Sequence, residues 1–324
     1  MEFPKAIKAS VEKELKEYET LFVESLRSDN VLLKQVVDHV LSRKGKMMRP
    51  IMVLLFAKLY GRVSINTLHT AAALELLHTA SLIHDDVVDE SMERRSQRSV
   101  NALWDNKVAV LTGDFFLSSA LMQVGITNNL SIINSISRLG GILAEGELLQ
   151  LSNLSSDSFD EKVYFDIIER KTASLFATCA ECGSYSVEAT PEQIRLAREF
   201  GKNLGICFQI RDDIFDYFES GKVGKPAGND MREGKLTLPA LLVLNSPDGK
   251  LYRDLALKIR RLEASAEEIR HFIEIVKQHH GIEMAEEKIK LFAEKALACL
   301  PNDGQEELIH SLGLFVSFAI GREY

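Results

Sequence analysis

The sequence contains few of the residues that cross-link chains or interrupt helices. Its 324 residues include only four cysteines, seven prolines and one tryptophan. So few cysteines exclude a disulfide-rich secreted domain and are typical of a protein in a reducing compartment. The amino-terminal segment MEFPKAIKAS also lacks the apolar stretch of a secretory signal peptide. We therefore expect a cytoplasmic protein.

Long apolar runs and excess positive charge are scarce as well. The segment IMVLLFA, at residues 51–57, is among the longest apolar runs, and it is far shorter than the ~20 residues that span a bilayer. We therefore expect no integral membrane segment. The net charge of −8 argues against nucleic acid as a partner. A hydrophobic content of 46% and a charged content of 27% are ordinary for a globular protein.

Strand-like alternation of polar and apolar residues is nearly absent, and helical periodicity takes its place. The apolar residues of segment 15–26 are spaced as one face of an amphipathic helix. Thr190 and Pro191 predict the start of another helix, with the threonine as N-cap and the proline in the first turn. No linker or low-complexity stretch divides the chain. We predict an all-α fold and a single domain over residues 1–324, although the length alone would allow two domains.

Two groups of three aspartates carry the strongest functional signal. Each follows the pattern D-D-x-x-D, and the helical rotation of about 100° per residue puts the first and third aspartate on one stripe. Carboxylates this close repel one another, a cost that a divalent cation such as Mg²⁺ removes. One such group alone is equally typical of an acidic helix end in solvent, but its recurrence in apolar sequence favours two facing groups that hold metal ions between them. The six residues are Asp85, Asp86, Asp89, Asp212, Asp213 and Asp216.

Basic residues in glycine-containing or apolar segments would complete a site for a phosphate-bearing ligand. Arg94 and Arg95 closely follow the first aspartate group, and arginine binds phosphate oxygens in a bidentate way. The glycine-rich segment 223–239 contains Lys225 and Lys235 but lacks the residue order of a Walker P-loop. The other basic candidates are Lys46, Arg49 and Lys171.

These motifs together resemble the trans-type isoprenyl diphosphate synthases, the head-to-tail prenyltransferases. The resemblance covers nearly the whole chain, and the motifs occur in the family's order. They are GKMMRP (45–50), LLHTASLIHDDVVDESMERR (76–95), LTGDFF (111–116), ERKTASLF (169–176), GICFQIRDDIFDY (205–217) and GKPAGNDMREGKLTLP (224–239). Lys44 and Ser96 depart from the family, which usually has glycine at both positions, and these departures bear on loop geometry rather than on activity.

The resemblance implies an all-α helical bundle around a deep central cavity, the isoprenoid synthase fold, usually as a homodimer. It implies three Mg²⁺ ions held by Asp85, Asp89 and Asp212, with the other three aspartates as further ligands or as supports for the ligands. The residues implied for the allylic diphosphate are Arg94, Lys171, Gln209, Lys225 and Lys235, with Thr172 beside them. Those implied for isopentenyl diphosphate are Lys46, Arg49, His78 and Arg95. The residues implied in catalysis are Asp85, Asp86, Asp89, Asp212, Lys171 and Lys225.

Product length, by the same resemblance, depends on the residues one turn before the first aspartate group. Members with short products commonly carry a bulky aromatic residue there, whereas this chain has Ala80 and Ser81. We therefore predict an open tunnel and, by family analogy, an all-trans product of about C30–C50. Such a product, grown from farnesyl or geranylgeranyl diphosphate, suits the side chain of a quinone. Met122, on the apolar helix after LTGDFF, is the candidate for the floor of the tunnel.

Other functions fit parts of the pattern. A short-chain synthase with a C15 or C20 product and the catalytic subunit of a heteromeric synthase both stay open. A terpene cyclase is disfavoured because cyclases generally carry asparagine, serine and glutamate in their second metal motif. A head-to-head synthase is also disfavoured, because it has no use for an isopentenyl site. A regulatory subunit typically loses the aspartates, all six of which are present here. A metal-storage bundle would need no glycine-lysine loop.

Overall fold

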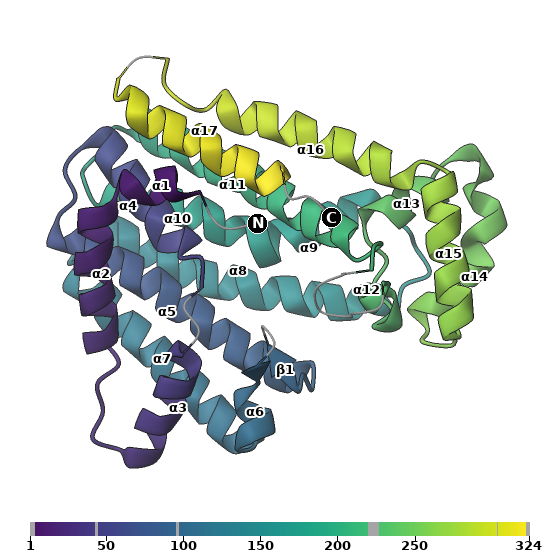
Figure 1. The fold of residues 1–324 in the computed structure, drawn as a ribbon, viewed down its shortest axis with the longest axis horizontal. Coiled ribbons are helices and arrows are strands. Elements are labelled where there is room, and N and C mark those ends of the chain that lie inside the picture. Colours follow the sequence, from purple (N-terminus) through teal and green to yellow (C-terminus); the bar gives the residue numbers. More distant parts are fainter. Residues whose placement is uncertain (1–3, 43–44, 95–96, 220–226, 303, 322–324) are drawn as a thin grey trace.

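The computed structural model describes residues 4–42, 45–94, 97–219, 227–302 and 304–321. Helices form nearly all of the regular structure in these residues (Figure 1). The two strands of the described part, β1 (Glu93–Arg94) and β2 (Gln97–Arg98), pair as one short antiparallel hairpin. The predicted all-α fold is confirmed.

The helices are numbered along the chain. The first half contains α1 (Lys5–Ala9), α2 (Glu12–Glu24), α3 (Val31–Leu41), α4 (Met48–Tyr60), α5 (Ile65–Val88), α6 (Val100–Leu103), α7 (Asn106–Ile126) and α8 (Leu130–Leu154). Next come α9 (Glu161–Ile168), the π-helix η1 (Glu169–Ala173), α10 (Ser174–Tyr185), α11 (Pro191–Phe215), α12 (Asn229–Arg232) and α13 (Leu238–Leu244). The last part contains the 3₁₀ helix η2 (Pro247–Tyr252), α14 (Arg253–Arg260), α15 (Ala266–Gln278), α16 (Gly281–Leu297) and α17 (Glu306–Ile320).

Capping residues determine where the two helices that carry the aspartates begin. At the start of α11 the backbone N–H of Gln193 donates to the hydroxyl of Thr190, and the Gln193 side chain accepts from the Thr190 N–H, with Pro191 in the first turn. The predicted start of this helix is confirmed. Ser64 and Thr67 form the same reciprocal cap at the start of α5. Both helices then run for 24 or 25 residues to their aspartates, which is a length of about 36 Å at 1.5 Å per residue.

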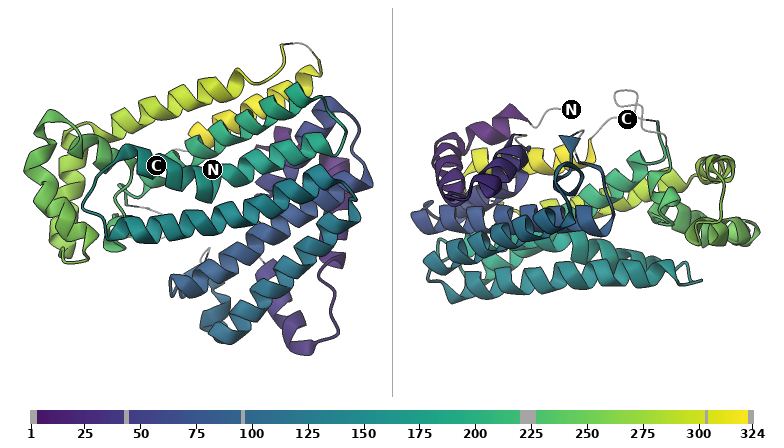
Figure 2. Two further views of the ribbon diagram at one scale, coloured as in Figure 1. Left: turned by 180° about the vertical axis from the view of Figure 1, so that it is seen from behind. Right: turned by 90° about the horizontal axis from the view of Figure 1, so that it is seen from below.

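The long helices pack side by side around a common core. Helix α5 packs most extensively against α7, and α10 against α11, while α4 packs on α10 and α16 on α11. Fully buried residues such as Leu76, Phe116 and Phe200 fill the spaces between them. The right-hand view of Figure 2 shows α1 and α2 on one side of the molecule and α8 on the other, while α3 contacts α7. The core lies between these helices, and residues at the carboxyl ends of α5 and α11 line one cavity.

Helix α7 is the one described helix that is long and apolar enough to cross a membrane by length and composition. About half of it is buried inside the protein, where it packs along α5. Its Gly113 lies so close to α5 that an added Cβ would sit 2.2 Å from Nε2 of His84. Core helices of water-soluble proteins also pass such a test, because helices buried on most sides are apolar all round.

Candidate active site

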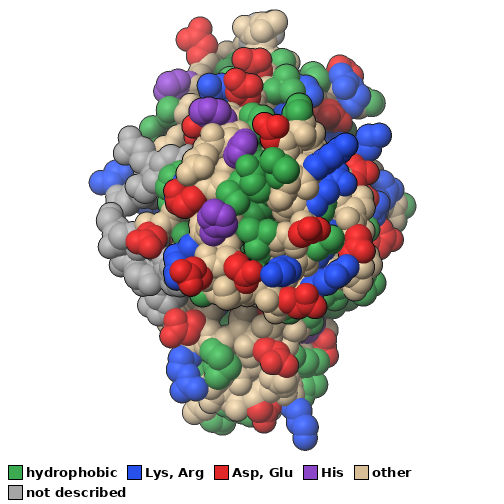
Figure 3. Space-filling model, turned by 90° about the vertical axis from the view of Figure 1, so that its right-hand side faces the viewer, with side chains coloured by type: hydrophobic (Ala, Val, Ile, Leu, Met, Phe, Trp, Pro, Cys, Tyr) green, Lys and Arg blue, Asp and Glu red, His purple; other side chains and the backbone are tan. Residues whose placement is uncertain are grey.

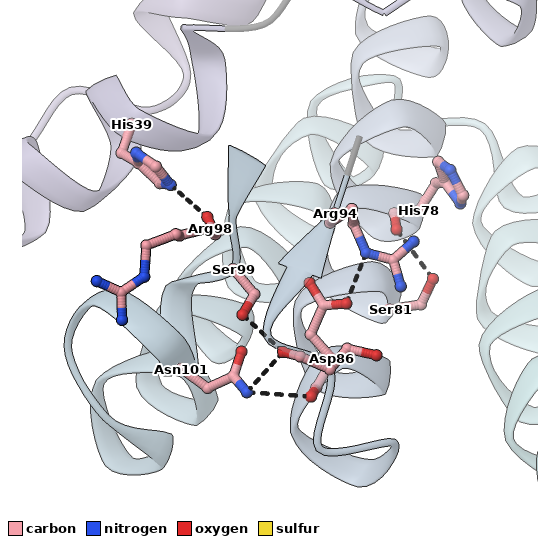
Figure 4. Close-up of polar contacts among 9 residues, drawn as sticks. His39, His78, Ser81, Asp86, Arg94, Arg98, Ser99 and Asn101 are labelled. Atoms are coloured by element: carbon pink, nitrogen blue, oxygen red, sulfur yellow. Dashed lines mark hydrogen bonds and ion pairs between the residues drawn. The ribbon is translucent and has the colours of Figure 1, made fainter. Parts of the chain in front are cut away.

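The first aspartate group lies at the carboxyl end of α5. Asp85 and Asp89 line a cavity of about 1250 Å³, whereas Asp86 is only 5% exposed. Figure 4 shows Asp86 facing Arg94, whose Nε atom donates a hydrogen bond of 2.7 Å to Asp86 Oδ1. Two of the three carboxylates are thus open to a ligand in the cavity. The third binds an arginine that lines the same cavity.

The hairpin that carries Arg94 is itself fixed to α3 (Figure 4). The Nε2 atom of His39 donates to the carbonyl oxygen of Arg98 at 2.9 Å. The side-chain amide of Gln97 donates to Nδ1 of the same histidine, also at 2.9 Å. Because β2 pairs with β1, these contacts hold the backbone from which Arg94 extends.

The second aspartate group lies at the carboxyl end of α11. Asp212 lines the same large cavity, but Asp213 is only 5% exposed. One oxygen of Asp213 accepts from the hydroxyl of Tyr164 at 2.6 Å, and the other accepts from the amide of Gln209 at 2.8 Å. The oxygen of that amide accepts in turn from the hydroxyl of Thr172 at 2.6 Å. Asp213 therefore orients Gln209 and Thr172, which both line the cavity.

Asp216, the last residue of the second group, caps the short helix α12. Its two carboxylate oxygens accept hydrogen bonds of 2.9 Å from the backbone N–H groups of Asn229 and Asp230. A carboxylate in front of a helix start satisfies N–H groups that have no partner within the helix. Asp216 thus connects the end of α11 to the segment that leads to Lys235.

Burial makes both groups electrostatically unfavourable in the absence of a cation. The negative end of a helix dipole lies at its carboxyl terminus, where additional carboxylates are destabilising. Burial, and then the nearby Glu147, raise the pKa of Asp85 to about 6, against the opposing effect of Lys171 and Arg94. Burial also raises the pKa of Asp213 well above its ordinary value. A bound cation would relieve this cost.

Lys171 and Thr172 lie in the π-helix η1, between α9 and α10. Single π turns inside helices are frequent at functional sites, because they redirect side chains. Lys171 Nζ lies 2.5 Å from Glu147 Oε1 of α8 and donates to Gln150 Oε1 at 3.0 Å. Gly146 permits this close approach, since a Cβ there would lie 2.8 Å from the Cβ of Arg170. The lysine is therefore held at the wall of the cavity that Asp85 and Asp212 also line.

One cavity brings the predicted substrate-binding residues together from α4, α5, the hairpin, η1, α11 and the segment before α13. Those that line it are Lys46, Arg49, His78, Arg94, Lys171, Thr172, Gln209 and Lys235. Lys46 Nζ also lies 4.9 Å from the ring of Phe318, which provides a cation–π contact. Arg95 and Lys225 lie outside the described residues.

The acidic residues fit Mg²⁺ in the way that enzymes acting on phosphates use it. Among the described residues, no group of three or more histidine, cysteine or acidic side chains lies close enough to enclose a metal ion. Mg²⁺ usually keeps several waters and is bound by one or two carboxylates together with phosphate oxygens of the substrate. Asp85 and Asp89 on α5, with Asp212 on α11, offer such incomplete sets of hard oxygen donors. The substrate's own oxygens would complete the coordination.

The residues predicted to set product length lie in different places. Ala80 and Ser81 line the cavity, and the hydroxyl of Ser81 donates to the carbonyl oxygen of His78 at 2.9 Å, so it needs no other partner (Figure 4). Met122 is 61% exposed on the surface of α7 and does not line the cavity. The prediction that Met122 forms the floor is therefore wrong for the chain on its own. The apolar sequence of α7 conceals that one face points outward, and Leu117 reaches the cavity instead.

Three residues of the site were missed by sequence reasoning. Tyr164 binds Asp213, but no motif marks it. Glu147 lines the cavity from a helix whose acidic residues look like ordinary surface residues. The sequence could have indicated Asp230, because it lies between a glycine and Lys235 in the predicted basic loop. Burial, and then Asp216, raise the pKa of Asp230 to about 7, while Lys235 opposes the shift.

Comparison with known proteins identifies the family. The sequence model of the polyprenyl synthetase family matches residues 30–276, and the chain belongs to this family. It is 38% identical over 220 residues to the octaprenyl diphosphate synthase of Escherichia coli K12, covering 68% of each chain. Its structure matches the crystal structure of a geranylgeranyl pyrophosphate synthase from Bacteroides thetaiotaomicron with a TM-score of 0.85. The two sequences are 47% identical, and the match covers 98% of each chain. A polyprenyl synthase from Caulobacter crescentus, crystallised with calcium and isoprenyl diphosphate, is 31% identical with a TM-score of 0.90, covering 98% of this chain and 97% of that one.

Proposed function

We propose that this chain, acting as one catalytic domain, is a Mg²⁺-dependent prenyltransferase. It condenses isopentenyl diphosphate head to tail onto an allylic diphosphate and makes a long all-trans polyprenyl diphosphate. The observation that carries the proposal is the single cavity of about 1250 Å³ in which Asp85, Asp89 and Asp212 lie together with the predicted basic residues. Its membership of the polyprenyl synthetase family supports the same reaction.

The residues around the cavity divide the work between two diphosphates. Arg94, Lys171 and Lys235 lie with the aspartates and would neutralise the diphosphate that leaves the allylic substrate. When bound, Mg²⁺ would supply further positive charge to this leaving group. Arg49, in the first turn of α4, and Lys46, just before that helix, would hold isopentenyl diphosphate beside it. The fixed positions of these cations lower the barrier because they need no rearrangement as charge develops.

The reaction requires no nucleophile from the protein. The allylic C–O bond breaks as diphosphate departs, the double bond of isopentenyl diphosphate forms the new C–C bond, and a proton is lost to the released diphosphate. Thr172 and Gln209 are hydrogen-bonded to each other at the cavity, and their oxygen atoms would stabilise positive charge on the allyl group. Apolar residues such as Leu77 and Leu175 line the rest of the cavity and would exclude water from the cation.

A long product is favoured by the shape of the cavity. Among the α5 residues that line the cavity, Ala80 and Ser81 are small and lie about one turn before Asp85, and the cavity also reaches Leu117 on α7 and Gly140 on α8. The octaprenyl diphosphate synthase of E. coli supports a long product. The geranylgeranyl pyrophosphate synthase structure, at the higher identity of 47%, favours the alternative of a C20 product. The open α5 wall leads us to prefer about C30–C50 by family analogy.

We also propose that the enzyme is a homodimer. Large apolar side chains are exposed on α7 and α8, and exposed apolar patches of this kind mark interaction surfaces. They are Val110, Leu111, Leu121, Met122, Ile126, Leu148 and Leu151. A second copy of the chain on this surface would bury them, and would place Met122 at the subunit contact. Light scattering on the purified protein should give twice the monomer mass of 36.3 kDa.

Nucleic acid remains disfavoured as a partner. The face drawn in Figure 3 mixes acidic and basic side chains, with several histidines beside an apolar cluster. The net charge of −8 agrees with this reading of the surface. The cytoplasmic location stays a prediction.

The test uses the purified protein alone. It is incubated with farnesyl diphosphate, labelled isopentenyl diphosphate and Mg²⁺, and the dephosphorylated products are sized by mass spectrometry. One dominant long polyprenol, lost in the double variant Asp85→Asn/Asp86→Asn, is the expected result. A C20 product would support the short-chain alternative. No incorporation by folded protein would contradict the proposal for the chain alone and would favour a heteromeric synthase.

A further inference from the structure

Helix α8 presents one stripe of residues to the large cavity. Gly140, Leu143, Ala144 and Glu147 all line it, at the spacing of one helix face. Glu147 marks the reacting end, because it contacts Lys171. Gly140 lies seven residues, about two turns or 10 Å, further along the helix. The stripe therefore runs from the diphosphate site toward the far end of the cavity.

Gly140 leaves open space in that far region. An added Cβ at this position would have no heavy atom within 4 Å. Gly113 and Gly146 differ from Gly140 in this respect. A Cβ at Gly113 would collide with His84, and one at Gly146 would collide with Arg170. Packing thus requires glycine at those two positions but not at Gly140. Glycine also destabilises a helix interior relative to other residues, so its presence here has a local cost that packing within the chain does not explain.

We propose that Gly140 is a determinant of product length, because its missing side chain leaves room for the distal end of the growing prenyl chain. The proposal rests on the proposed function and extends the set of length-determining residues from α5 to α8. Helix side chains lean toward the amino terminus of their helix, which on α8 is the direction away from Glu147. A large side chain at Gly140 would therefore close the far end of the cavity and leave the diphosphate site intact.

The neighbouring Gly141 provides a matched control. An added Cβ at Gly141 also has no heavy atom within 4 Å, and it lies in the same helix, but Gly141 does not line the cavity. Gly140→Phe and Gly141→Phe are compared with the wild type for product length, for the rate of the first condensation onto farnesyl diphosphate, and for oligomeric state by light scattering.

The expected result is specific to Gly140. Gly140→Phe should shorten the dominant product by two or more isoprene units and leave the first condensation within about threefold of the wild type, whereas Gly141→Phe should make the wild-type product. An unchanged product in Gly140→Phe, or an equal shift in both variants, would overturn the proposal. If the wild type makes a C20 product, the long-chain function fails, and Gly140 is still judged by whether its variant alone stops earlier.

A binding measurement decides the question without turnover. The affinities for farnesyl diphosphate and for a C40 polyprenyl diphosphate are measured with Mg²⁺ present. Gly140→Phe should keep the first affinity and weaken the second about tenfold or more, relative to Gly141→Phe. Equal affinities of the two variants for the C40 compound would contradict a role of Gly140 in holding the distal chain. Failure of the wild type to bind either compound would contradict the proposed function itself.

Discussion

At the end of α5, two of three aspartates line the cavity and the third, Asp86, binds Arg94. At the end of α11, with the same D-D-x-x-D spacing, only Asp212 lines it. The other two are occupied within the protein, one by Tyr164 and Gln209 and one by the start of α12. Identical spacing on a helix therefore does not give identical roles. The neighbouring elements decide which carboxylates remain open to a ligand.

The residues one helical turn before each aspartate group differ in size. Ser81 lies four residues before Asp85 and is small, while Phe208 lies four residues before Asp212 and packs against Phe176 with ring centroids 5.6 Å apart. Both Ser81 and Phe208 line the cavity. The cavity thus has one wall narrowed by aromatic rings and one that is open beside the first aspartate group. A growing chain has its free path along α5.

The largest predicted effect concerns the open carboxylates. Asp85→Asn and Asp212→Asn should each lower kcat/KM by about 10²–10³-fold, because each removes a carboxylate that would hold Mg²⁺ at the leaving diphosphate. Asp213→Asn, the matched change at a closed carboxylate, should lower activity less and leave the Mg²⁺ concentration for half-maximal activity unchanged. Steady-state kinetics over a Mg²⁺ series test this. An equal shift in Mg²⁺ dependence for all three variants would remove the distinction between open and closed carboxylates.

The second prediction concerns the two walls. Ser81→Phe should shorten the main product to C15 or C20, because it places an aromatic ring on the open side. Phe208→Ala removes an aromatic ring from the wall on the α11 side. The growing chain does not follow this wall, so the variant should leave product length nearly unchanged. Mass spectrometry of the dephosphorylated products distinguishes the two. An unchanged product in Ser81→Phe would contradict the path along α5.

A smaller effect is expected at the cap of α12. Asp216→Ala removes two hydrogen bonds to backbone N–H groups and should cost about 1 kcal/mol of stability, the usual cost of losing a helix cap. Activity should fall about tenfold, since α12 leads to Lys235, with most of the change in KM. Asp216→Asn keeps one acceptor oxygen and should recover part of both losses. Thermal unfolding and kinetics would contradict this role if Asp216→Ala behaved like Asp85→Asn, with intact stability and a loss of kcat/KM of about 10²–10³-fold.

The smallest effect is a pH dependence of metal binding. The pKa of Asp85 is raised to about 6, so below that pH a proton competes with Mg²⁺. The Mg²⁺ concentration for half-maximal activity should rise about fourfold at pH 5.5 relative to its plateau above pH 7. A raised carboxylate pKa also means that the metal-free protein loses stability as the pH rises from about 4 to about 6.

Glu147→Gln sharpens the pH prediction. After burial, the charge of Glu147 raises the pKa of Asp85 most. The variant should therefore lower the pH at which the Mg²⁺ requirement begins to rise. Two results would contradict the competition between a proton and Mg²⁺ at Asp85. One is a Mg²⁺ requirement that stays constant between pH 5.5 and 7, and the other is a rise that begins at the same pH in Glu147→Gln and in the wild type.

Much of the fold was predictable because its signals are local. Helical periodicity indicated the all-α class, and Thr190 with Pro191 marked the start of α11. The convergence of Lys46, Arg94 and Lys235 on the aspartates followed from the family resemblance, not from spacing. What remained hidden depends on neighbours distant in sequence. The contact of Asp86 with Arg94, the exposure of Met122 and the place of Glu147 in the cavity arise from packing between helices, which periodicity within one helix does not reveal.

The central claim is that three carboxylates, and not six, meet the metal ions. Crystals of the protein with Mn²⁺ and a non-hydrolysable farnesyl diphosphate analogue would test it by anomalous scattering. Manganese peaks should lie beside Asp85, Asp89 and Asp212, with Asp86 on Arg94, Asp213 on Tyr164 and Asp216 on α12 as they are here. A peak coordinated by Asp86, Asp213 or Asp216 would contradict the account.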